Sequence, residues 1–270
     1  MDAARTKTAT PSLLAPDEPT PVDIVNPAGT ADTLLVCDHA SRRVPRELGD
    51  LGLPPSAFDR HIAWDIGAAE VARNLSRAFD APLVLSGYSR LVVDLNRRLD
   101  HPTSVPEVSD GTLVPGNQAL TPLDRARRIA ALFEPYHNAI AAALARIASR
   151  QIAPAIVSVH SCTPVFKGFE RPWHIGVLWN NDPRLAVPMM ARLAARSDVV
   201  VGDNQPYSAR DGHGYTMRAH AETAGLPHVL VEIRQDLIDT HKGAAHWAGV
   251  LADALNPLLA DPATRRPLKA

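Results

Sequence analysis

Short apolar runs alternate with stretches of helical spacing along most of this 270-residue chain. Residues Thr33–Cys37 form a short apolar run, which is typical of a strand buried on both faces of a sheet. From Ile66 to Phe79 the apolar residues return every three or four positions, which predicts an amphipathic helix. The same patterns predict strands at 83–88, 91–95, 155–160, 175–179, 199–201 and 228–233, and helices at 122–150, 183–196, 216–224 and 242–259.

This alternation indicates an α/β fold, a three-layer α/β/α sandwich around a mostly parallel or mixed central sheet. Residues 1–21 are rich in Pro, Thr, Ala and acidic side chains and have little periodicity. We therefore expect a flexible N-terminal tail over residues 1–21 and a single domain over residues 22–270. The Pro-, Gly- and Ser-rich segment 104–118 is expected to be a long loop of the kind that often walls an active site.

Charge and cysteine content exclude several classes of protein. The chain has 28 basic and 29 acidic residues without a Lys/Arg cluster, so a nucleic-acid partner is not expected. No apolar run approaches the roughly 20 residues that span a bilayer, and the first residues lack the apolar core of a secretion signal. We expect a cytoplasmic protein without a membrane partner, in which Cys37 and Cys162 stay reduced and buried.

Polar residues that follow the predicted strands are the candidates for chemistry. In open α/β sheets, ligands bind beyond the carboxyl ends of the strands, so these residues should meet in one crevice. They are Asp38, His39, Asn96, Arg97, His160, Glu232 and Arg234. A single histidine in such a place is more often a capping or core side chain than a ligand. Two histidines together with carboxylates suit a metal site.

Six segments of the chain form a pattern that is more specific than any one of them. They are CDHAS at 37–41 with Val44-Pro45, HIAWDIGA at 61–68, SRLVVDLNR at 89–97, VHS at 159–161, NQPY at 204–207 and VEIR at 231–234. In this order they resemble the N-formylglutamate amidohydrolase family over Leu34–Ile238. The resemblance implies a phosphorylase/hydrolase-like sandwich related to zinc carboxypeptidases and aspartoacylases. It also implies hydrolysis of an N-acyl amino acid, with N-formyl-L-glutamate as the first expectation.

The resemblance also implies one catalytic zinc ion (Zn2+). Hydrolysis of an amide near neutral pH needs a strong nucleophile, and zinc provides one by lowering the pKa of bound water to about 7. Such a site has three protein ligands and an open position. We expect His39 and His160 as two ligands and Asp65 as the third. Asp65 is chosen because Arg42 stands where zinc carboxypeptidases have a Glu, three residues after the first histidine.

The third ligand has alternatives. Asp65 could instead cap the helix that follows it. Asp38 could orient a ligand histidine from behind, and His61 is a further possible ligand.

The related hydrolases use a strand-end carboxylate to move protons between water and the leaving amine, and Glu232 matches it. Its alternative is a salt bridge with Arg234. Asn96 and Arg97 resemble the pair that holds a substrate carboxylate in aspartoacylase-like hydrolases. Arg90 is expected to polarise the scissile carbonyl, although Arg90, Asn96 and Arg97 could also belong to an internal ion-pair network.

The remaining polar candidates have weaker signals. Asp94 is expected to align Asn96 and Arg97, and we assign Arg234 and Tyr207 to substrate binding. Other side chains could complete a pocket for a second carboxylate. They are Arg171, His174, His213, Arg218 and His220.

Two other classes of function compete with a metal-dependent amidohydrolase. A thiol hydrolase is suggested by Cys162 and Cys37, each two residues from a candidate histidine, but neither has the glycines of a nucleophile elbow. A non-catalytic protein that binds an acidic metabolite would need the arginines but not a metal and a base. The acyl group, the divalent metal and the oligomeric state, monomer or small homo-oligomer, stay open.

Overall fold

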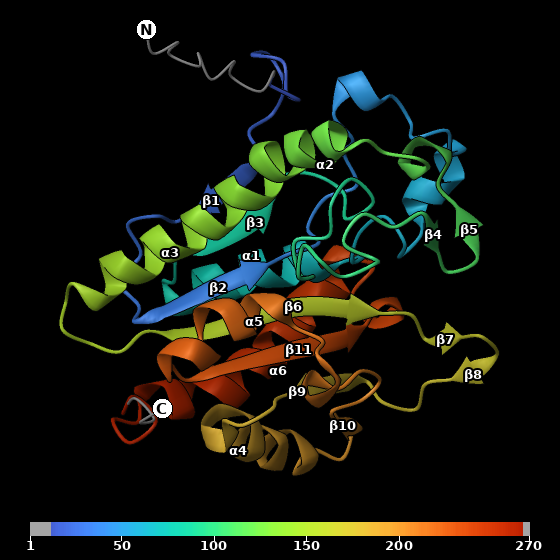
Figure 1. Ribbon diagram of the computed structural model, residues 1–270. Helices are drawn as coiled ribbons and strands as arrows, with labels where there is room; N and C mark the ends of the chain where they lie inside the picture. The colour runs from blue at the N-terminus through green and yellow to red at the C-terminus, as the bar shows by residue number, and fades with distance from the viewer. Residues whose placement is uncertain (1–11, 267–270) are drawn as a thin grey trace, which may run out of the picture.

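The computed structural model describes residues 12–266 and has the predicted three-layer α/β/α architecture (Figure 1). Within these residues a central sheet of seven strands has the order β1-β3-β2-β6-β11-β9-β10. Its strands are β1 (Val22–Val25), β2 (Thr33–Cys37), β3 (Leu83–Ser86), β6 (Ala155–Cys162), β9 (Ile175–Leu178), β10 (Val201–Asp203) and β11 (His228–Arg234).

The sheet is mixed, and its central strands bring their carboxyl ends to one edge. Strands β3, β2, β6 and β11 run parallel, whereas β1 is antiparallel to β3 and β9 is antiparallel to β11. The register places Glu232 of β11 directly opposite His160 of β6. Because opposite residues of a parallel pair share a face, two of the candidate residues lie side by side.

Helices cover both faces of the sheet. They are α1 (Ala68–Phe79), α2 (Pro122–Arg128), α3 (Glu134–Ala148), α4 (Pro183–Ala194), α5 (Tyr215–His220) and α6 (His241–Ala260). Helices α1, α4 and α6 share one core with the sheet, and α3 and α5 share the other (Figure 1). None of the helices between residues 12 and 266 combines the length and the apolar character needed to cross a membrane.

Strand β2 shows why its sequence is apolar throughout. Leu35 and Cys37 enter the core under α1, whereas Leu34 and Val36 enter the core under α3. A strand with a helix layer on each side has no polar face, so the expected alternation of polar and apolar residues is absent.

The helix predicted over 122–150 is divided. A π-helical turn at Ile129–Phe133 separates α2 from α3. Pro135, in the first turn of α3, has no N–H to donate to the carbonyl of Ala131 four residues earlier. Loss of that bond accounts for the wider turn.

Two further predictions made from local pattern differ from the structure. Leu91–Leu95 is not a strand but a chain of turns, in which Val92 N–H donates to the Ser89 carbonyl at 3.0 Å. Of the predicted N-terminal tail, residues 12–21 are described and pack on the domain: Leu13 is only 2% exposed, and the Tyr88 hydroxyl donates to the Pro19 carbonyl. Residues 1–11 lie outside the described residues.

Two small hairpins extend from the sheet edge where the central strands end (Figure 1). One consists of β4 (Val108–Ser109) and β5 (Thr112–Leu113) and lies within the loop predicted at 104–118. The other consists of β7 (Val165–Phe166) and β8 (Phe169–Glu170).

Candidate active site

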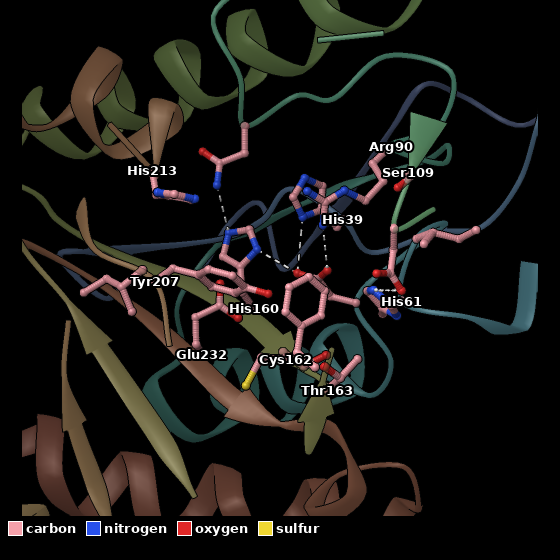
Figure 2. Close-up of a pocket in the computed structure, with 18 of the residues that line it drawn as sticks. His39, His61, Arg90, Ser109, His160, Cys162, Thr163, Tyr207, His213 and Glu232 are labelled. Atoms are coloured by element: carbon pink, nitrogen blue, oxygen red, sulfur yellow. Dashed lines mark hydrogen bonds and ion pairs between the residues drawn. The ribbon is translucent and has the colours of Figure 1, made fainter. Parts of the chain in front are cut away.

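A cavity of about 350 Å³ opens at the carboxyl ends of β2, β6 and β11 (Figure 2). Of the nine residues expected to be catalytic, substrate-binding or metal-ligating, all except Arg234 line it. They are His39, Asp65, Arg90, Asn96, Arg97, His160, Tyr207 and Glu232. The two hairpins contribute Ser109, Asp110, Gly111, Phe166 and Lys167 to the wall. Its volume suits a small molecule.

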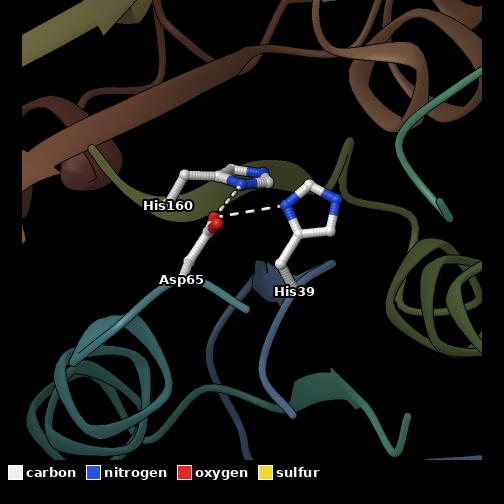
Figure 3. Close-up of side chains that lie close together, drawn as sticks. All are labelled: His39, Asp65 and His160. Atoms are coloured by element: carbon white, nitrogen blue, oxygen red, sulfur yellow. Dashed lines mark hydrogen bonds and ion pairs between the residues drawn. The ribbon is translucent and has the colours of Figure 1, made fainter. Parts of the chain in front are cut away.

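His39, Asp65 and His160 form a buried cluster in this cavity (Figure 3). Their ligand atoms all lie within 4.8 Å of one another. The Nδ1 atoms of both imidazoles point at the same oxygen, Asp65 Oδ2, from 3.2 Å for His39 and 2.7 Å for His160. Two imidazole nitrogens and a carboxylate oxygen converging in this way form a possible metal-binding triad.

A second carboxylate holds each histidine from behind. His39 Nε2 lies 2.8 Å from Asp94 Oδ1, and His160 Nε2 lies 2.8 Å from Asp38 Oδ2. Such a carboxylate accepts a hydrogen bond from the Nε2–H group, which leaves Nδ1 as the metal-binding nitrogen. Although burial opposes a charged ring, Asp38 and Asp65 raise the pKa of His160 well above its ordinary value.

Asp65 reaches the triad because the backbone before α1 turns it inward. The N-cap of α1 is Gly67, and no side chain caps the helix, so Asp65 does not act as its cap. Gly67 has φ of 78°, and a Cβ there would lie 2.2 Å from the Ile238 carbonyl oxygen, so a side chain does not fit at this turn. The Asp65 backbone N–H donates to the His39 carbonyl at 2.9 Å, which ties the two segments together.

Arg90 joins two of these carboxylates. Its Nη2 donates to Asp94 Oδ2 at 2.8 Å, and its Nη1 lies 3.4 Å from Asp65 Oδ1. The ion-pair network considered for Arg90 therefore exists, yet the side chain still lines the cavity. Asp94 also accepts the backbone N–H of Asn96 at 2.9 Å, which fixes the backbone at Asn96.

Glu232 is a buried carboxyl in the cavity wall. It is 8% exposed, and among the described residues its Oε2 has no hydrogen-bond partner. Burial raises the pKa of Glu232 to about 7. The alternative salt bridge with Arg234 does not form, because Arg234 pairs with Asp236 at 2.8 Å.

Asn96 and Arg97 differ in whether their side chains already make hydrogen bonds. Asn96 Oδ1 accepts the backbone N–H of Thr216 at 2.9 Å, so this amide is fixed. Arg97 is half-buried at the wall, and its guanidinium makes no hydrogen bond or ion pair within residues 12–266. Its cationic group is therefore available to a ligand.

Several polar residues take places that the sequence did not indicate. Arg234 lies outside the cavity wall, because β11 ends there and the side chain turns to Asp236. His61 lines the cavity but faces Asp110, 3.5 Å away, rather than the triad. Thr216, which no motif indicated, donates its hydroxyl to Asp38 Oδ1 at 2.6 Å and fixes the carboxylate behind His160.

The two thiols do not support a thiol hydrolase. Cys37 and Cys162 are free and buried, as expected, and only Cys162 lines the cavity. Burial raises the pKa of the Cys162 thiol to about 12 and that of Cys37 well above its ordinary value. A neutral thiol is a poor nucleophile.

The sequence model of one enzyme family, N-formylglutamate amidohydrolase, matches residues 31–239. The chain belongs to the N-formylglutamate amidohydrolase family. The match spans every residue of the triad together with Glu232, and it supports an enzyme of the amidohydrolase class. No curated protein gives a significant match.

Two solved structures are similar to this member of the N-formylglutamate amidohydrolase family. The crystal structure of a gene product of Agrobacterium tumefaciens is 39% identical, has a TM-score of 0.89 and is covered to 98%, with 92% of this chain covered. The crystal structure of N-formylglutamate amidohydrolase from Ralstonia eutropha is 18% identical, has a TM-score of 0.64 and is covered to 97%, with 89% of this chain covered. At 18% identity, the second likeness supports the mixed α/β fold.

Proposed function

We propose that this protein is a metal-dependent amidohydrolase that cleaves the amide of a small acidic N-acyl amino acid, with N-formyl-L-glutamate as the first candidate. The observation that carries the proposal is one cavity that combines the His39, Asp65 and His160 triad with the carboxyl of Glu232, whose Oε2 has no hydrogen-bond partner in the described part of the chain. A binding protein for an acidic metabolite needs neither feature. Family membership supports amide hydrolysis independently.

The donor set of the triad fits zinc. His39, Asp65 and His160 would hold the ion through two imidazole nitrogens and one carboxylate oxygen. Asp94 and Asp38 support the two histidines from behind, as the partners of metal-binding histidines do. When bound, zinc or another divalent ion supplies a Lewis acid that lowers the pKa of a water molecule and polarises a carbonyl.

Glu232 is the proposed general base and acid. Its carboxylate accepts a proton from the attacking water, whose oxygen bonds to the acyl carbon. As the C–N bond breaks, Glu232 returns this proton to the amine, so N-formyl-L-glutamate gives L-glutamate and formate. The position opposite His160 and the free Oε2 atom suit this exchange.

The two arginines take different parts in the proposal. Arg90, held in place by Asp65 and Asp94, offers a fixed cation to the negative charge that develops on the carbonyl oxygen. Arg97, which has no hydrogen-bond or ion-pair partner within residues 12–266, would bind a substrate carboxylate through a bidentate fork, with Asn96 beside it. Tyr207 completes the substrate-binding wall.

Arg97→Lys is expected to raise KM for an acidic N-acyl amino acid by about tenfold, with kcat changed by less than about threefold. Lysine keeps the charge but loses the second, parallel hydrogen bond to a carboxylate. Steady-state kinetics on N-formyl-L-glutamate measure both constants. Arg98→Lys is the matched control, because Arg98 is an exposed neighbour paired with Asp100. An unchanged KM for Arg97→Lys would remove Arg97 from substrate binding.

The function is tested by assaying purified, zinc-supplied protein against N-formyl and N-acetyl derivatives of glutamate, aspartate, glutamine and leucine. Release of the free amino acid measures turnover, and calorimetry measures binding. We expect the fastest turnover with N-formyl-L-glutamate. Preference for another acyl group would assign a different deacylase, and tight binding without turnover of any compound would favour the binding protein.

A further inference from the structure

Arg171 is a buried arginine that stands behind the cavity wall. It is 5% exposed, and no carboxylate of the described chain forms an ion pair with it. Its Nη1 donates to the carbonyl and hydroxyl oxygens of Thr163, at 3.0 and 3.1 Å. Its Nη2 donates to Tyr207 Oη at 3.0 Å. Burial of a guanidinium without a counter-ion is costly. Hydrogen bonds to neutral oxygens alone do not explain why an arginine occupies this position.

The same guanidinium fixes the plane of the Tyr207 ring. It lies 5.0 Å from the centre of that ring and 5.1 Å from the centre of Phe166, so two aromatic faces hold it. The imidazole of His213 stacks on Tyr207 at 5.4 Å, with an angle of 19° between the planes. Tyr207 is thus held in one orientation, and both Tyr207 and His213 line the cavity (Figure 2).

The hydrogen bond between Arg171 and Tyr207 determines which of the two groups is the donor. Arginine has only donors, so Tyr207 Oη accepts from Arg171 and keeps its own O–H. Burial raises the pKa of Tyr207, which keeps the phenol neutral. Within residues 12–266, this hydroxyl has no acceptor, although its side chain faces the cavity. The N–H from Arg171 also polarises the phenol and makes it a stronger donor.

We propose that Arg171 is a positioning residue that directs the Tyr207 hydroxyl as a hydrogen-bond donor toward an oxygen of the bound N-acyl amino acid. The inference rests on the proposed function for the identity of the substrate. A structural role is the competing explanation, because the Arg171 backbone N–H donates to the Pro164 carbonyl at 2.8 Å and the side chain binds Thr163 at the base of the β7–β8 hairpin.

A double-mutant cycle separates the two explanations. Tyr207→Phe and Arg171→Met are each expected to lower kcat/KM for N-formyl-L-glutamate about tenfold, the size of one lost hydrogen bond in a transition state. In the Tyr207→Phe background, adding Arg171→Met should cost less than about twofold, because the donor it directs is already absent. Arg171→Lys, which can still donate to Oη, should recover part of the loss.

Arg196→Met is the matched control. Arg196 pairs with Asp198 at 3.0 Å and does not line the cavity, so kcat/KM should stay within about twofold of wild type. Thermal unfolding of every variant shows whether it folds. If Arg171→Met does not fold, Arg171→Lys takes its place in the cycle.

Two results would overturn the proposal. One is an equal loss from Arg171→Met in both backgrounds, which would assign a structural role. The other is wild-type activity of Tyr207→Phe. Absence of turnover by the wild-type protein would instead contradict the proposed function. The same cycle, measured on the dissociation constant of N-formyl-L-glutamate, would then still test the coupling between Arg171 and Tyr207.

Discussion

His39→Ala and His160→Ala are each expected to abolish bound metal and hydrolysis together. Each substitution removes one of the three donors that converge within 4.8 Å, and two donors do not hold zinc firmly. Metal content per chain is measured by mass spectrometry after dialysis and compared with kcat of the same sample. Stoichiometric metal in either variant would remove that histidine from the ligand set.

The matched control for these variants is His241→Ala. The His241 side chain is 92% exposed at the start of α6, so its loss should change neither metal content nor kcat.

Asp65→Ala belongs to the same series, and because Asp65 does not cap α1, this variant too should lose the metal. If Asp65 were only a helix cap, its loss would lower stability by about 0.5–2 kcal/mol and leave the metal content unchanged. That result would contradict the assignment of Asp65 as a ligand.

Glu232→Gln is expected to lower kcat by at least about 100-fold while metal content stays stoichiometric. Glutamine keeps the size of the side chain but cannot accept a proton from water. The loss should appear in kcat more than in KM, because the substrate-binding residues are unchanged. Single-turnover kinetics with metal analysis of the same sample provide the measurement.

Glu134→Gln, at the exposed first turn of α3, is the control for the chemical change itself and should leave kcat unaltered. Near-normal kcat in Glu232→Gln would mean that another group moves the proton. A loss of metal together with kcat would assign Glu232 to the metal site instead.

The fold was predictable where burial and hydrogen bonding point the same way. Strands β2, β6 and β11 have helices on both faces, so each contains a buried and mostly apolar run. His39 follows β2, whereas β6 and β11 continue two residues past His160 and Glu232. Leu91–Leu95 is just as apolar, but its side chains are buried within a chain of turns. An apolar run reports burial, and the sequence does not reveal which backbone partners are available. Strand β1, half-exposed at the sheet edge, has no such run.

The site was predictable in its chemistry more than in its geometry. Asp65 could be a cap or a ligand in the sequence, and only the turn at Gly67 resolves which side it faces. Arg234 shares the strand parity of Glu232, yet the strand ends there and a local carboxylate, Asp236, takes the side chain. Thr216 supports the site from a position 178 residues after Asp38, with no motif to mark it.

The most direct test of the account is the hydrolysis rate of N-formyl-L-glutamate in one protein sample before chelation, after chelation and after resupply of zinc. We predict one bound divalent ion per chain, a loss of at least about 100-fold on its removal, and recovery of the original rate when one equivalent of zinc returns. Turnover at the original rate in protein shown to be free of metal would contradict the central claim that His39, Asp65 and His160 form a catalytic metal site.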